Sequence, residues 1–287
     1  MNWLLLTIFA ILSRATFGIA TKVLSNNVKV SPITQSVLLT GAAAILTVLV
    51  SPFIGGLSFH GLASLWPIAL LMTVSQAFGN IVFFKGLEKL EASSAQVVFA
   101  SILIWSTILS VIFLGSHFSY LQLVGIFILL GAILLVQYRK GVTLIDRNAL
   151  YILAAAALFA VFQITSAEMA KTVSAGAYLL TAYLGATVII GLGYWSKVKA
   201  DIPALTKKAS VTLKATLFAS ATSLLYFVFA YFAYQKAPDR GVVVVLLTAQ
   251  VVVTVVLAII FLKERDYIKR KLAAGVLAVI AGFLIKS

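Results

Sequence analysis

The sequence predicts an all-α, polytopic membrane protein with ten transmembrane helices arranged as two inverted five-helix repeats. Composition, the length of the apolar runs and an internal repeat lead to this fold class. Of 287 residues, 62% are hydrophobic and 10% are charged, whereas a soluble domain is about half apolar and a quarter charged. A transmembrane helix needs ~20 mostly apolar residues. Ten such helices therefore use most of the chain and leave only short loops.

Apolar runs bounded by charged residues, proline or glycine define the ten helices. Pro32 begins the second and Pro52 follows it, and Asp239 and Arg240 separate the eighth from the ninth. The runs are too long for membrane β-strands and do not alternate polar with apolar residues. Backbone groups in lipid must bond internally, so each run is expected to be helical. The predicted helices cover residues 2–21, 32–51, 63–84, 92–114, 119–138, 149–170, 176–196, 213–235, 241–262 and 270–286.

Basic residues are distributed unevenly over the loops between these helices. The odd-numbered loops hold 17 of the 22 Lys and Arg residues, and the even-numbered loops with the C-terminus hold four. Lys and Arg are enriched in cytoplasmic loops. The count therefore predicts that the odd loops lie in the cytoplasm and both termini outside. The formal charge of +14 is explained in the same way, and we expect no binding of nucleic acid.

The chain also repeats itself. Residues 83–116 align with residues 231–264 at an offset of 148, and each copy has an aromatic pair, a charged break, a long apolar run and a Phe-Leu-x-polar ending. After that ending, residues 123–135 resemble residues 273–285. This predicts a first repeat over 1–140 and a second over 148–287. Five helices per repeat make the second repeat inverted, as in many secondary transporters.

The segments that end the two repeats carry a family resemblance. FLGSHFSYLQLVGIFILLGAILL (113–135) and FLKERDYIKRKLAAGVLAVIAGFLI (261–285) resemble the helix-4/5 and helix-9/10 junctions of EamA-type drug/metabolite transporters. Gly115 and Glu264 match the family's Phe-Leu-Gly-Glu pattern, whereas Ser116 and Lys263 depart from it. The proline that the family often has midway along helices 4 and 9 is missing here.

The resemblance implies ten helices, no cofactor, and transport of small metabolites through the cell membrane, often outward from the cytoplasm. Coupling in the family is to protons or absent. Family members commonly keep both termini in the cytoplasm, which is the reverse of the orientation that the charge count predicts.

Arg14 is the clearest candidate for a substrate contact. An ionisable group within a span costs ~2.5–3.5 kcal/mol on insertion scales and is a functional hypothesis by default. Thr7, Arg14, Gly18 and Thr21 share one face of the first helix by their spacing. A guanidinium on that face suits a carboxylate or phosphate. The alternative is an arginine that extends to the membrane interface or forms a structural pair.

Glu168 is the one carboxylate expected within a span. Burial would raise its pKa and suit it to proton coupling. Lys171 follows three residues later, however, and an ion pair at the membrane interface is the reading that we favour.

Polar residues on the inner helices form stripes that should face the interior of the bundle. There they either hold helices together or line a cavity. The fifth and tenth helices instead carry small residues that permit close packing. We expect a monomer, with a dimer through those helices as the alternative. The remaining candidates for substrate binding are Gln76, Asn80, Trp105, Gln163, Tyr226 and Gln250.

The sequence offers no catalytic or metal-binding motif. Cysteine is absent, and both histidines, His60 and His117, lie in predicted loops. We therefore expect a secondary transporter without a cofactor, which moves an amino acid or small organic anion by alternating access through a central site. Two alternatives stay open: a transporter of a lipid-linked substrate, and a membrane scaffold or sensor subunit that transports nothing.

Overall fold

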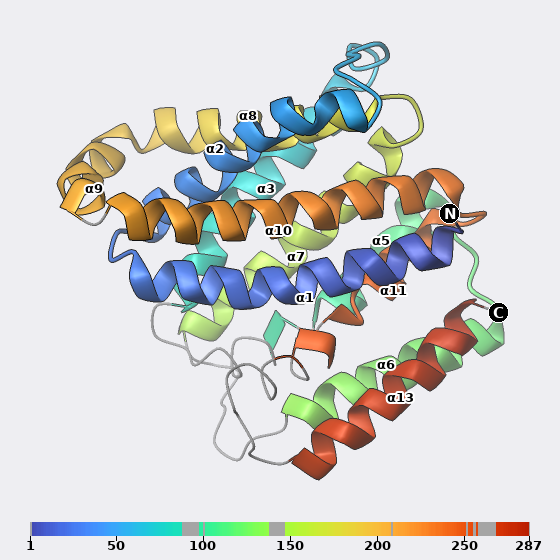
Figure 1. The fold of residues 1–287 in the computed structure, drawn as a ribbon. Helices are drawn as coiled ribbons and strands as arrows, with labels where there is room; N and C mark the ends of the chain where they lie inside the picture. The colour runs from blue at the N-terminus through green and yellow to red at the C-terminus, as the bar shows by residue number, and fades with distance from the viewer. Residues whose placement is uncertain are drawn as a thin grey trace.

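The computed structural model describes residues 2–87, 98–99, 101–137, 147–207, 209–250, 252–254, 257 and 268–286. These residues form eleven α-helices and one short 3-10 helix, and they contain no strand (Figure 1). The elements are α1 (Trp3–Asn27), α2 (Pro32–Val50), η1 (Ser51–Phe53), α3 (Trp66–Leu87), α5 (Ile102–Leu114), α6 (Tyr120–Gln137), α7 (Arg147–Met169), α8 (Ala175–Gly193), α9 (Trp195–Lys207), α10 (Ala209–Lys236), α11 (Arg240–Leu247) and α13 (Ile268–Lys286).

Six of the described helices are long and apolar enough to cross a membrane: α1, α2 with η1, α3, α7, α8 and α10. Shorter apolar helices occur at Ile102–Leu114, Tyr120–Ala132, Arg240–Thr254 and Ala273–Ile285. The all-α membrane class is therefore confirmed, and the count of ten spanning helices is not. Parts of the fourth and ninth predicted helices, 92–97 and 258–262, lie outside the described residues.

The helix that the sequence did not predict is α9, which occupies a segment assigned to the loop after the seventh span. Its mixture of lysines and apolar residues, with Pro203 inside it, gives no long apolar run. The helix forms on the surface instead. Val198 and Leu205 pack against the bundle, and α9 contacts α2, α8 and α10. A periodicity of 3.6 residues was the signal for this helix.

Asp201 fixes α9 to the beginning of α2. Its Oδ2 accepts hydrogen bonds from the backbone N–H of Ser31 at 3.0 Å, the Ser31 hydroxyl at 2.6 Å and the Thr34 hydroxyl at 2.6 Å. Ser31 is the N-cap of α2, so the carboxylate lies at the positive end of that helix. Burial alone would raise the pKa of Asp201, but the hydrogen bonds from Ser31 and Thr34 outweigh burial and lower it.

The first helix is longer than the sequence predicted. It continues past residue 21 to Asn27. The last turns contain one lysine and three small polar residues, and these do not end a helix whose backbone hydrogen bonds already continue from the preceding turns. Arg14 consequently lies near the middle of α1.

Helices from the two halves of the chain pack side by side. α1 lies along α10, α3 along α7 and α2 along α8, while α6 and α13 form a pair set apart from the rest (Figure 1). Gly125 of α6 permits that last contact, since a Cβ there would lie 2.9 Å from the Leu284 side chain. Both termini lie at one end of the bundle and α9 at the other.

The contact of Asp201 with α2 generates a pH-dependent prediction. Asp201→Asn should lower the free energy of unfolding by about 1 kcal/mol at neutral pH, as the loss of a helix cap does. A lowered pKa means that the ionised form stabilises the fold above the ordinary carboxyl pKa of about 4, and that this contribution disappears as the pH falls below it. Thermal unfolding in detergent at several pH values measures the difference. Thr206→Ala on the outer side of α9 is the control, and a difference that persists at low pH would contradict the assignment.

Candidate functional site

The predicted fourth and ninth helices are each interrupted by a tight turn, at equivalent places. In the ninth, the N–H of Thr248 donates to the Val245 carbonyl, and the N–H of Ala249 donates to the Leu246 carbonyl. Both bonds join residues three apart, whereas α-helical bonds join residues four apart. In the fourth, Ser101 donates to Val98 in the same way just before α5 begins. Positions 101 and 249 differ by 148, the offset of the sequence repeat. Neither segment contains the proline that commonly marks such a break in a helix.

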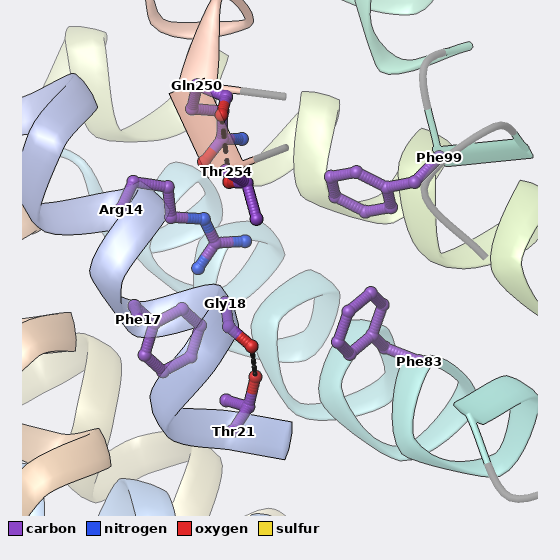
Figure 2. Close-up of a pocket in the computed structure, with 8 residues that line it drawn as sticks. All are labelled: Arg14, Phe17, Gly18, Thr21, Phe83, Phe99, Gln250 and Thr254. Carbon is purple, nitrogen blue, oxygen red and sulfur yellow. Dashed lines mark hydrogen bonds between the residues drawn. The ribbon is translucent and has the colours of Figure 1, made fainter. Parts of the chain in front are cut away.

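A small cavity lies beside both interruptions (Figure 2). In Figure 2 the Arg14 side chain extends from α1 between Gln250 and Phe17, toward Phe83 and Phe99 on the opposite wall. The cavity offers about 20 Å³ to the centres of water molecules, which is room for about one or two waters. A metabolite therefore fits only if the walls separate. The lining residues are Arg14, Phe17, Gly18, Thr21, Phe83, Phe99, Gln250 and Thr254.

Aromatic rings surround the Arg14 guanidinium. Its Cζ lies 4.7 Å from the ring centroid of Phe17, 5.2 Å from that of Tyr226 and 5.4 Å from that of Phe159. The residue is 9% exposed. Such cation–π contacts are worth about 0.5–2 kcal/mol each. They hold the charge in place without neutralising it.

No carboxylate among the described residues balances this charge. The three acidic residues that the structure describes each have another partner. Glu168 pairs with Lys171, Asp201 accepts from Ser31 and Thr34, and Asp239 accepts from Ser116 and Gly241. Within the described part of the chain, Arg14 is a buried cation that lacks a counter-ion.

A chain of hydrogen bonds lies next to the guanidinium. Ser106 donates to Gln163 Oε1 at 3.1 Å, and Gln163 Nε2 donates to the Tyr226 hydroxyl at 3.2 Å. These residues come from α5, α7 and α10. The structure thus brings together four of the predicted residues: Arg14 with Gln250 at the cavity, and Gln163 with Tyr226 beside it.

Gln76 and Asn80 lie on the same face of α3 as Phe83, at spacings of four and three residues. Both are buried, with exposed fractions of 2% and 5%. Gln76 Oε1 is a buried acceptor without a hydrogen-bond partner. Neither residue lines the small cavity, so both are placed on a neighbouring buried face and their contact with a substrate stays a prediction.

Trp105 does not line the small cavity. It is 39% exposed on α5, and its contact with a substrate stays a prediction. Phe99 occupies the wall instead, together with Phe83. A tryptophan side chain is tolerated in contact with lipid, so its presence in an apolar helix does not show which face of that helix points into the bundle.

Glu168 forms the expected i,i+3 ion pair with Lys171 at the end of α7. It makes no bridge with Arg14. Phe17, Phe99 and Phe159 are neighbours of Arg14 that were not predicted. Phe17 follows Arg14 by one helical turn, but nothing in the sequence distinguishes the other two from ordinary core phenylalanines.

A tight contact closes the bundle at the end where the termini lie. Asp239 Oδ1 accepts from the Ser116 hydroxyl at 2.8 Å and from the backbone N–H of Gly241 at 2.7 Å. This joins the end of α5 to the beginning of α11. Gly241 is required here, since a Cβ would overlap the Ser116 hydroxyl and lie 3.0 Å from Ser110 Cβ.

These features define a polytopic helical membrane protein with interrupted helices and a buried polar centre. Residues 1–138 match the model of the EamA-like transporter family, so this part of the chain is similar to that family. The resemblance drawn from the sequence is confirmed. No curated protein matches the chain.

A solved crystal structure shares the fold with a TM-score of 0.71 and 15% sequence identity. The match covers 98% of this chain and 94% of the other. At this identity the likeness concerns the fold alone. It extends the structural similarity from the first half to nearly the whole chain.

The close approach at Gly241 generates the second prediction. Gly241→Ala should destabilise the protein by about 1–3 kcal/mol, because the added methyl group displaces Ser116 from Asp239. Gly275→Ala in α13 is the matched control, since no atom lies within 4 Å of its Cβ position. The control should be neutral or stabilising by up to about 1 kcal/mol. Equal unfolding temperatures for the two variants would refute the role of the contact.

Proposed function

We propose that this protein transports a small carboxylate-bearing metabolite, either an amino acid or a small organic anion, across the cell membrane by alternating access. The buried Arg14 guanidinium at the wall of a cavity beside two helix interruptions carries the proposal. A planar fork of donors binds a carboxylate with two parallel hydrogen bonds. The EamA-like family of the first half supports transport as the activity.

We infer that the chain consists of two inverted repeats, 1–140 and 148–287. The packing supports this, because exchanging the halves converts the α1–α10 contact into the α7–α3 contact and leaves the α2–α8 and α6–α13 contacts unchanged. The matching turns at Ser101 and Ala249 support it as well. In transporters of this construction, interrupted helices in corresponding positions mark the binding site.

The most extensive helix–helix contacts join helices of opposite repeats. These contacts limit which helices can move apart when the site opens to one side of the membrane. α1 packs on α10, and α3 and α5 pack on α7, while α11 contacts both α10 and α5. Arg14 and Phe17 belong to the first group and Phe83 to the second (Figure 2). We infer that these two groups separate to admit the substrate, and that the five-helix repeats do not move as units.

The described lysines and arginines support an orientation with α9 in the cytoplasm and both termini outside. Lys29, Lys197, Lys199 and Lys207 lie near the α9 end, whereas Lys171 and Lys236 lie near the end of the termini. The Ser116–Asp239 contact then closes the outer side of the site. The family resemblance implies outward transport, and such transport would begin with the outer side of the site closed in this way. Glu168 is assigned no coupling role, because its ion pair with Lys171 accounts for it.

Substitution of Arg14 tests the proposal. Uptake and counterflow are measured in proteoliposomes with pooled labelled amino acids and small carboxylates. Arg14→Leu should lower uptake at least tenfold, because a hydrogen bond to a charged group contributes about 1.5–3 kcal/mol. Arg14→Lys should retain part of the activity, because the charge remains and the fork is lost. Carboxamide analogues of a transported acid should compete poorly.

The matched control is Leu12→Ala on the same helix, since Leu12 is 44% exposed on the lipid side. It should transport at the wild-type rate. Undiminished uptake by a folded Arg14→Leu variant would remove Arg14 from the site. Failure of the wild type to take up any of the acids would argue instead for a lipid-linked substrate or for a scaffold.

A further inference from the structure

The surface helix α9 carries two features that the transport site does not use. Its exposed side bears three lysines, Lys197, Lys199 and Lys207. It also bears two large apolar side chains, Trp195 and Ile202, which are 59% and 43% exposed. No residue of the helix is buried. Exposing a tryptophan and an isoleucine to water is unfavourable, so a helix face that contacts only water rarely carries them beside three lysines.

The lysines of α9 have no acidic partner in the described part of the chain. Lys197 contacts the Tyr194 ring at 5.9 Å, and no carboxylate lies within ion-pair distance of the three side chains there. The one acidic residue of the helix, Asp201, is committed to Ser31 and Thr34. Lys29 and Lys214, on the neighbouring elements, are also exposed. The positive charge at this end is therefore uncompensated by the described residues.

By their spacing, Trp195 and Ile202 are seven residues apart and share one flank of α9. Lys199, four residues after Trp195 and three before Ile202, borders that flank, and Lys207 lies further round the exposed side. An apolar flank beside a basic face is typical of a helix that lies in the membrane interface. α9 also occupies the place where the spans of α8 and α10 reach the end of the bundle (Figure 1).

We propose that α9 lies among the lipid headgroups and binds anionic phospholipids. Trp195 and Ile202 enter the boundary between headgroups and acyl chains, and the lysines contact the phosphates. The bond from Asp201 to Ser31 transmits this attachment to the beginning of α2. The interaction concerns the lipid around the protein, so it is independent of the transported substrate.

The absence of cysteine from the chain allows a direct test. Ser196→Cys, an exposed position on α9, is labelled with an environment-sensitive fluorophore. The full-length protein is reconstituted into phosphatidylcholine vesicles that contain spin-labelled phosphatidylglycerol or spin-labelled phosphatidylcholine. The anionic lipid should quench the fluorophore more strongly, and added salt should reduce the preference. Replacing Lys199 and Lys207 by Gln should reduce it roughly fivefold for each lysine.

The double replacement of Lys171 and Lys236 by Gln is the matched control. It removes the same charge from the opposite end of the bundle and should leave the preference unchanged. Equal quenching by the two lipids would overturn the proposal. An equal loss of preference in both double variants would overturn it too, because the attraction would then arise from the overall charge and not from α9.

Discussion

A single positive charge in the middle of an apolar bundle constrains the rest of this structure. Placing an arginine at the centre of a span costs ~2.5–3.5 kcal/mol even on the lenient insertion scales. The rings of Phe17, Tyr226 and Phe159, at 4.7–5.4 Å, offset part of that cost. They cannot replace a counter-ion, and the described carboxylates all lie elsewhere. The centre of the protein therefore holds a positive charge that no described carboxylate neutralises, and an anionic ligand would neutralise it.

The interrupted helices place this charge where backbone polarity is also available. A three-residue turn in a span leaves backbone groups without their α-helical partners, and such groups are tolerated at membrane depth only inside the protein or beside a water-filled cavity. The turns at Ser101 and Ala249 meet that condition, since the cavity of Arg14 lies beside both. Their separation by the offset of the sequence repeat makes the site a product of both halves of the chain. One repeat alone would supply half of the walls.

Much of this arrangement could be predicted from sequence, for one physical reason. Polar groups in an apolar span avoid lipid, so Arg14, Gln163 and Gln250 had to face the interior, and they do. Aromatic residues carry no such information, and for that reason the sequence did not distinguish Phe99 and Phe159, which lie near Arg14, from Trp105, which is 39% exposed. The turns in the fourth and ninth spans were invisible because no proline marks them. α9 was not predicted because it is a short amphipathic helix and contains no long apolar run.

The hydrogen bonds of Asp201 limit how the bundle can move. α9 is continuous in sequence with α8 and α10, so its bond to Ser31 ties the beginning of α2 to two helices of the other half. α2 also packs directly on α8 and α10. A motion that separated residues 1–140 from 148–287 as blocks would break these contacts together with those of α1 with α10 and α3 with α7. A motion that opens the space between Arg14 on α1 and Phe83 on α3 preserves both of those helix pairs. The packing thus favours rearrangement between mixed groups of helices, with the central cation on one side and its aromatic wall on the other.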